Sequence, residues 1–197
     1  MRKDRISCSR AKNFLNLFIF GGFFIFPILL SAAQNDVVIN EIAWMGTAIS
    51  ANDEWLELKN NTSQEIDLTG WTLKAIDGTP KISLTGIIPA QGYFLLERTD
   101  DDSMPNIIAD QIYTGALGNS GENLELRDAQ NNLIDSVNCS ETWPAGDNLT
   151  EQTMERITGG WQTSSAAGGT PKAINSSGAT ATSSEPSTPP DQETSAG

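Results

Sequence analysis

Short runs of apolar residues recur along the middle of the chain, and within them apolar and polar positions alternate. In Glu54–Leu58 and in Asn123–Arg127, leucines occupy every second position, with polar residues between them. A period of two is typical of a β-strand with one buried face. The pattern predicts seven strands and a weaker eighth, at Val37–Ala43, Glu54–Asn60, Trp71–Ala75, Lys81–Leu84, Tyr93–Arg98, Asn123–Asp128, Leu133–Val137 and, more weakly, Ile107–Tyr113.

Turn-forming residues separate these runs. Asparagine, aspartate, glycine and serine gather at Asn60–Ser63, Asp77–Gly78, Asn119–Gly121 and Asp128–Asn132. Several short strands at this spacing, joined by such turns, indicate an all-β sandwich or barrel. No stretch between residues 36 and 175 has a sustained helical period, so we expect an all-β fold.

The N-terminus has the pattern of a targeting segment. Five basic residues and one acid precede an apolar run, Phe14–Leu30, which is followed by Ser31–Ala33. A basic start, an apolar centre and small residues at the end are typical of a secretory signal peptide. The apolar run is also near the lower limit for spanning a bilayer. We therefore expect residues 1–33 to be a hydrophobic signal helix, either a cleaved signal peptide or a signal anchor, with the remainder secreted or associated with the cell envelope.

The rest of the chain divides into a body and a tail. The composition changes from Ser164 onward, and residues 176–197 consist mainly of serine, threonine, alanine, proline and glycine. Such a segment buries too little apolar surface to offset the entropy of ordering. We expect a disordered Ser/Thr/Pro-rich C-terminal tail at 176–197 and one β-domain at 36–175, a size that suits a single core.

The charge and the missing histidine restrict the function. The chain has 12 Lys and Arg, 25 Asp and Glu, no histidine and a net charge of −13. Beyond residue 33 it has 7 bases and 24 acids, or about −17. Catalytic triads, Cys-His pairs and the usual zinc sites are excluded. The acidic surface disfavours nucleic acid, and membrane contact is expected only through an uncleaved N-terminal segment.

Beyond residue 33, Cys139 is the single cysteine, so no intrachain disulfide is expected.

Several ordered motifs resemble the lamin-tail domain. The resemblance spans residues 36–175, and its motifs are Ile39–Trp44, Asp53–Asn60, Asp67–Leu73, Ile88–Tyr93, Leu117–Leu126, Met154–Arg156, Trp161 and Thr170–Asn175. One position departs from the family pattern: where the family usually has Pro-Gly, this chain has Pro171-Lys172. It implies an immunoglobulin-like β-sandwich of about seven to nine strands. It also implies a bacterial-type exported member, in a family whose known roles are non-catalytic.

Two groups of acids are candidate metal ligands. Asp53, Glu54 and Glu57 cluster in sequence and with Glu41, and Asp100–Asp102 follow a predicted strand. Several oxygen ligands of this kind suit calcium, and no other cofactor is expected. The alternative is that the glutamates belong to the strand pattern and that the aspartates form a solvated loop. The absence of a calcium-loop spacing favours that alternative.

The five tryptophans are candidates for ligand contact or for the core. Trp55 and Trp71 fall in predicted strands, so we expect them in the core. Trp44 and Trp143 lie near glycine and proline at strand ends and in loops, so we expect them to be more exposed than Trp55 and Trp71. If any tryptophan contacts a ligand, we expect it to be one of these two. Tryptophan is enriched at binding hot spots.

These observations favour an exported, non-catalytic β-sandwich module that binds or displays at the cell envelope or outside the cell. Its partner is expected to be a protein or a polysaccharide. The first alternative is a structural envelope protein that self-associates through edge strands. A less favoured alternative is a secreted hydrolase that depends on a metal or on paired carboxylates.

Overall fold

The computed structural model describes residues 32–177, which form twelve β-strands and no helix. The predicted signal segment at 1–33 and the predicted tail at 176–197 lie almost wholly outside the described residues, so both stay predictions. Within the described part of the chain, no helix is long and apolar enough to cross a membrane.

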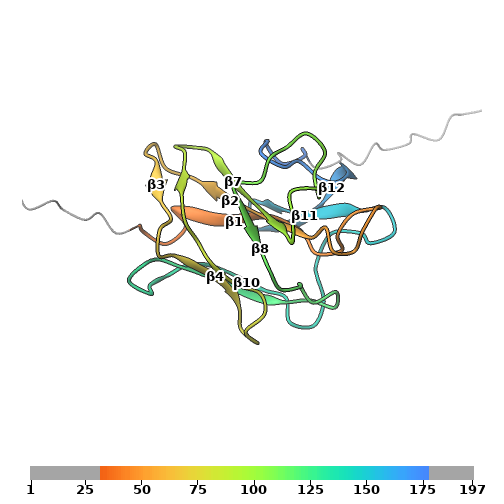
Figure 1. Ribbon diagram of the computed structural model, residues 1–197, viewed down its shortest axis with the longest axis horizontal. Coiled ribbons are helices and arrows are strands. Elements are labelled where there is room, and N and C mark those ends of the chain that lie inside the picture. The colour runs from red at the N-terminus through yellow and green to blue at the C-terminus, as the bar shows by residue number, and fades with distance from the viewer. Residues whose placement is uncertain (1–31, 178–197) are drawn as a thin grey trace, which may run out of the picture. The chain divides into compact units, whose positions relative to one another are not determined.

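The larger layer is a six-stranded sheet with β1 near its centre (Figure 1). Its neighbours are antiparallel, except that β7 and β8 run parallel. The strand order is β12 (Gly160–Ala167), β11 (Gln152–Ile157), β1 (Val37–Ala43), β2 (Trp55–Asn60), β7 (Tyr93–Arg98) and β8 (Gln111–Tyr113). The first strand is thereby held between an early strand and a late one.

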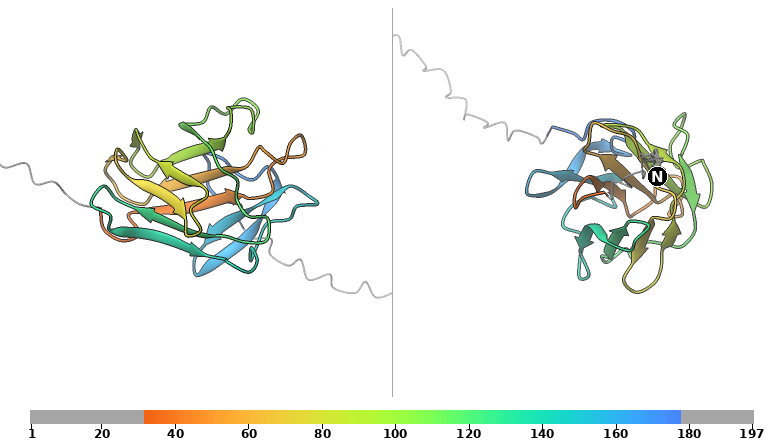
Figure 2. Two further views of the ribbon diagram at one scale, coloured as in Figure 1. Left: turned by 60° about the horizontal axis from the view of Figure 1, so that its bottom comes forward. Right: turned by 90° about the vertical axis from the view of Figure 1, so that its left-hand side faces the viewer.

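The second layer is a four-stranded sheet that faces the first (Figure 2). Its order is β10 (Leu133–Asn138), β9 (Asn123–Arg127), β4 (Thr72–Ala75) and β5 (Lys81–Ser83). A two-stranded pair, β3 (Ile66–Asp67) with β6 (Ile87–Ile88), completes the fold. The alternating pattern indicated a sandwich or a barrel, and the structure is the β-sandwich that the family resemblance implied.

The main core lies between the two sheets. Alternation along each strand sends every second side chain inward, so leucines of β2 meet those of β4 and β9. Core side chains that are fully buried include Ile39, Ile42, Leu56, Leu58, Leu73, Leu96, Leu124 and Leu126. Trp55 and Trp71 are buried as expected, although Trp55 lies on the outer face of the six-stranded sheet. Cys139 is also buried.

All eight predicted strands are present. β1 and β7 have the predicted bounds, five others differ by one residue at one end, and the weakest prediction begins at Gln111 instead of Ile107. The chain turns there first, because Asn106 has φ of 65° and the Ile107 N–H donates to the Met104 carbonyl.

The expected count of seven to nine strands was wrong, because four strands were missed. β3 and β6 have two residues each, too few to alternate. β11 has only two apolar side chains, Met154 and Ile157, among its six residues. β12 extends to Ala167, past the change of composition at Ser164. Strands with few large apolar side chains give little alternation to detect.

A second, smaller core covers part of the outer face of the six-stranded sheet. Ala43, Met45, Trp55 and Leu95 form it, and Met104 and Ile107 of the β7–β8 loop pack on them. This loop therefore lies over the sheet, and it helps to form the site described below.

Candidate functional site

Three buried glutamates lie side by side on the outer face of the six-stranded sheet. Glu41 of β1 is directly opposite Glu155 of β11 and Glu57 of β2. All three side chains have 0% exposure. We call them the glutamate row. Like charges directly opposite one another destabilise a sheet, so this arrangement needs hydrogen-bond donors to offset the repulsion.

The C-terminal segment, residues 168–176, supplies most of these donors. The Thr170 N–H and hydroxyl donate to Glu41 at 3.0 and 2.9 Å. The Lys172 N–H donates to Glu57 at 2.5 Å, and the Ser176 N–H and hydroxyl donate to Glu155 at 3.0 and 2.9 Å. Residues without regular secondary structure thus close over the sheet. The conformation of residues 168–176 is therefore held by hydrogen bonds to the glutamate row beneath them.

Burial changes the acidity of the row. It raises the pKa of Glu41 to about 7 and that of Glu57 to about 8, while hydrogen bonds from Thr153 and from Lys172 act in the opposite direction. Among residues 32–177, no salt bridge reaches any of the three glutamates. The Lys172 ammonium instead contacts Asp110 at 3.0 Å. Hydrogen bonds, and no salt bridge within the described residues, therefore satisfy the three carboxyl groups of the row.

Close packing at Gly169 shows how tightly the C-terminal segment fits. Gly169 has φ of 64°, and a Cβ there would lie 1.9 Å from the Glu41 carboxylate. Lys172 also has a positive φ, 58°, in the position where glycine would be easier. These contacts assign the glutamate row a structural role, which is to fix the C-terminal segment.

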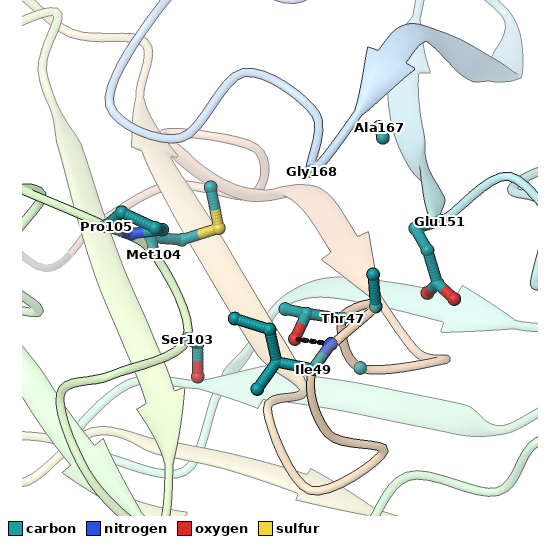
Figure 3. Close-up of a pocket in the computed structure, with 10 residues that line it drawn as sticks. Thr47, Ile49, Ser103, Met104, Pro105, Glu151, Ala167 and Gly168 are labelled. Carbon is teal, nitrogen blue, oxygen red and sulfur yellow. Dashed lines mark hydrogen bonds between the residues drawn. The ribbon is translucent and has the colours of Figure 1, made fainter.

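A pocket of about 250 Å³ opens beside this segment. Three loops and the end of β12 line it: β1–β2, β7–β8 and β10–β11. Figure 3 shows Ser103 and Met104 on one side and Glu151 on the other, with Ile49 between them in this view. The lining residues are Gly46, Thr47, Ala48, Ile49, Ser103, Met104, Pro105, Glu151, Ala167 and Gly168. The wall is mainly aliphatic and contains no aromatic ring.

Side-chain and backbone hydrogen bonds fix the loops around the pocket. The Thr47 hydroxyl donates to Asp53 at 2.8 Å and accepts the Ile49 N–H at 3.2 Å. Asp147 accepts the Leu149 N–H at 2.7 Å. The Glu151 carbonyl accepts the Gly168 N–H at 2.7 Å. The pocket is therefore preformed by local hydrogen bonds rather than by the main core.

Two polar oxygens in the pocket wall lack hydrogen-bond partners within the described residues. They are the Ser103 hydroxyl and Oε2 of Glu151, and both atoms are buried. The Ser103 N–H donates to Glu97 at 3.0 Å, and the same serine, hydroxyl included, helps to lower a Glu97 pKa that burial raises. The Ser103 hydroxyl thus interacts with the Glu97 carboxylate. Oε2 of Glu151 accepts no hydrogen bond from the described residues. An unpaired buried carboxylate oxygen is costly.

The three loops also carry exposed apolar side chains and an unbalanced charge. Ile49, Ile108 and Leu149 are 87%, 73% and 92% exposed. Residues 44–54, 99–110 and 139–151 contain nine acids and no lysine or arginine. Exposed apolar groups within a charged rim are typical of interaction surfaces. We call these three loops the acidic loop end.

The acids predicted as calcium ligands have other contacts. Asp53 accepts from Thr47, and Glu54 pairs with Arg98 at 3.0 Å and accepts the Leu117 N–H at 2.7 Å. Glu57 belongs to the glutamate row. In the β7–β8 loop, Asp100 accepts the Asp102 N–H at 3.3 Å, and Asp101 accepts the Ala109 N–H at 2.7 Å.

These acids are therefore divided among the outer face of the sheet and separate loops. Within residues 32–177, no three acidic, histidine or cysteine side chains are grouped as a metal ion would require. The two candidate calcium sites stay predictions.

Trp44 and Trp143 do come together, but not as exposed rings. They stack with centroids 6.2 Å apart and planes at 8°. Each indole N–H donates to a carbonyl, that of Trp44 to Ala145 at 3.1 Å and that of Trp143 to Gly118 at 2.8 Å. Trp44 is half-buried and thus more exposed than Trp55 and Trp71, as expected, whereas Trp143 is buried, at 7% exposure. Proximity to proline does not prevent burial when a second ring covers the first.

Several residues that line the pocket carried no sequence signal. Ile49, Ser103 and Met104 belong to no motif, and Glu151 stands alone after a loop. Only the fold brings them to one pocket. The one available signal was the excess of acids in the loops, which the sequence showed at Asp100–Asp102.

The two facing sheets define a β-sandwich module. A family model for the lamin tail domain matches residues 31–141, more than half of the chain. The chain therefore belongs to the lamin-tail domain family, a family of non-enzymatic immunoglobulin-like domains. A search of the curated proteins found no match. β11, β12 and the C-terminal segment lie beyond the matched residues.

Proposed function

We propose that this chain is an exported, non-catalytic module that binds a partner at the cell envelope or outside the cell through its acidic loop end. The observation that carries the proposal is the preformed pocket, which is bordered by loops with exposed apolar side chains. The loops extend from a sandwich with a buried core, and loops on such a scaffold are the usual position of binding residues. The basic and apolar N-terminus supports export.

The test is capture from native cell envelope by the immobilised chain, read by mass spectrometry and glycan analysis. A matched pair of variants assigns the surface. Ile49→Ser removes an exposed isoleucine of the pocket, and Ile76→Ser removes an isoleucine that is 61% exposed in the turn between β4 and β5. We expect one partner to be retained by the wild type and by Ile76→Ser and to be lost by Ile49→Ser. Equal capture by both variants would refute the role of the pocket.

Export is tested separately. Expression of the full chain in a bacterial host, followed by fractionation and N-terminal sequencing, should find the protein outside the cytoplasm. A mature end near residue 34 would identify a cleaved signal peptide, whereas an intact membrane-bound chain would identify an anchor. Retention in the cytoplasm would contradict the proposal.

Self-association is a second candidate, and β12 favours it. This eight-residue strand ends the six-stranded sheet, and no further described strand pairs with it. Unpaired edges can pair between copies, although the net charge opposes contact at low salt. Sedimentation at increasing concentration and salt distinguishes the two candidates, because a constant monomer removes the second.

A further inference from the structure

We infer that the pocket at the acidic loop end binds a lysine side chain presented by a basic segment of a protein partner. The inference rests on the proposed binding function and narrows its partner to a protein. Three properties of the pocket carry it: its size, its chemistry and the charge around it.

The size fits one side chain. A volume of about 250 Å³ corresponds to about eight waters of liquid and lies just below the usual range of small-ligand pockets. A polysaccharide chain needs an extended surface, commonly with aromatic rings. The lining contains no aromatic residue, and Trp44 and Trp143 cover each other. The pocket therefore suits a single flexible side chain better than a sugar polymer.

The chemistry of the wall fits an aliphatic stem with a charged end. Ile49, Met104 and Pro105 provide apolar surface, and Oε2 of Glu151 is a buried acceptor with no partner in the described chain. Lysine places four methylene groups along apolar surface and carries three donors at its tip. An ammonium in the pocket would lie beside the half-buried Glu151 side chain and balance the charge of its carboxylate.

The charge of the loops selects the same partner. The acidic loop end has nine acids and no lysine or arginine, so its potential attracts a basic segment and increases the rate of encounter. No lysine or arginine lines the pocket. The chain therefore offers no cation of its own for Glu151 among the lining residues.

The test measures binding of a fluorescein-labelled peptide of about nine residues, with three lysines among glycine and serine, to the full chain by fluorescence anisotropy. The matched peptide carries acetyl-lysine at the same positions. We expect acetylation and the substitution Glu151→Gln each to weaken binding at least about tenfold, as removal of a buried charge partner does. Glu141→Gln, which removes an exposed acid of the same β10–β11 loop, should change it by less than about twofold.

NMR spectra and a free diamine complete the test. Shifts induced by the lysine peptide should centre on Ile49, Met104 and Glu151. Equal effects of Glu151→Gln and Glu141→Gln, or equal binding of the acetylated peptide, would overturn the inference. Binding of 1,5-diaminopentane as tight as that of the peptide would overturn the choice of a protein partner.

The outcomes separate this inference from the proposed function. If the lysine peptide does not bind but envelope capture still depends on Ile49, the lysine inference fails and the binding function stands. If capture also fails, both fall.

Discussion

The free energy of unfolding should decrease as the pH rises from 5 to 9, because Glu41 and Glu57 must ionise inside the folded protein. The folded pKa is about 7 for Glu41 and about 8 for Glu57, against 4.5 for the free side chain. An acid with a raised pKa binds its proton more tightly in the folded state. The bound proton therefore contributes fully to the free energy of unfolding below pH 4.5. This contribution is lost as the pH rises through the folded pKa values of 7 to 8.

The size of the effect follows from the shift. One pKa unit corresponds to about 1.4 kcal/mol, so the shift of Glu57 to about 8 corresponds to about 5 kcal/mol. That is a large part of the stability of an ordinary domain, about 5–15 kcal/mol. The other buried acids with resolved shifts, Glu54, Glu97, Glu122 and Asp135, have raised pKa values through burial and act in the same direction.

The measurement is urea unfolding followed by tryptophan fluorescence at pH 5, 7 and 9. Glu57→Gln cannot ionise, so its profile should be flatter than that of the wild type. At pH 5 it should be less stable by about 1–3 kcal/mol, because Asn40 or the Lys172 N–H loses an acceptor. The control is Glu65→Gln at an exposed position, which should keep the wild-type slope. A wild-type stability that is equal or greater at pH 9, or an unchanged slope in Glu57→Gln, would refute the reasoning.

Three further predictions concern stability. Gly169→Ala should lower the free energy of unfolding by at least about 2 kcal/mol, because its Cβ would collide with a carboxylate. Gly159→Ala, which has φ of 83° and open space around it, should cost about 1 kcal/mol from backbone strain alone, and equal losses would contradict the collision. Arg156→Met should cost about 2–4 kcal/mol, because it leaves buried Asp135, 2.6 Å from the guanidinium, without its partner. Adding Asp135→Asn should recover part of this loss, and chemical denaturation measures both. Finally, a chelator should leave the melting temperature unchanged at neutral pH, since the candidate acids are not grouped around a cation position in the described chain; a higher melting temperature in calcium would contradict this.

The sandwich was predictable wherever strands bury one face against the main core. Leucines at every second position of β2 and β9 reveal that face in a single sequence. β11 and β12 were missed because they carry few large apolar side chains, so no period of two is visible in them. Thr153 and Glu155 are buried by hydrogen bonds to distant residues, and local alternation carries no record of such contacts.

The site was predictable only in its charge. The sequence drew attention to Glu57 and to the aspartates at 100–102, but the register that aligns Glu41 with two other glutamates comes from pairing between distant strands. The pocket needs three loops and the end of β12 at once. The burial of Trp143 likewise depends on Trp44, which lies far away in the sequence and stacks on it.

The position of β1 has a consequence for how the chain folds. This first strand is central in its sheet, and Glu41 bonds to Thr153, 112 residues further along the chain. Pairings across so long a separation slow folding and make it cooperative, because the loop must close before the contacts form. A growing chain that has not yet reached β11 has β1 as an unpaired edge. The sandwich therefore reaches its native state only after nearly all of residues 32–177 have been made.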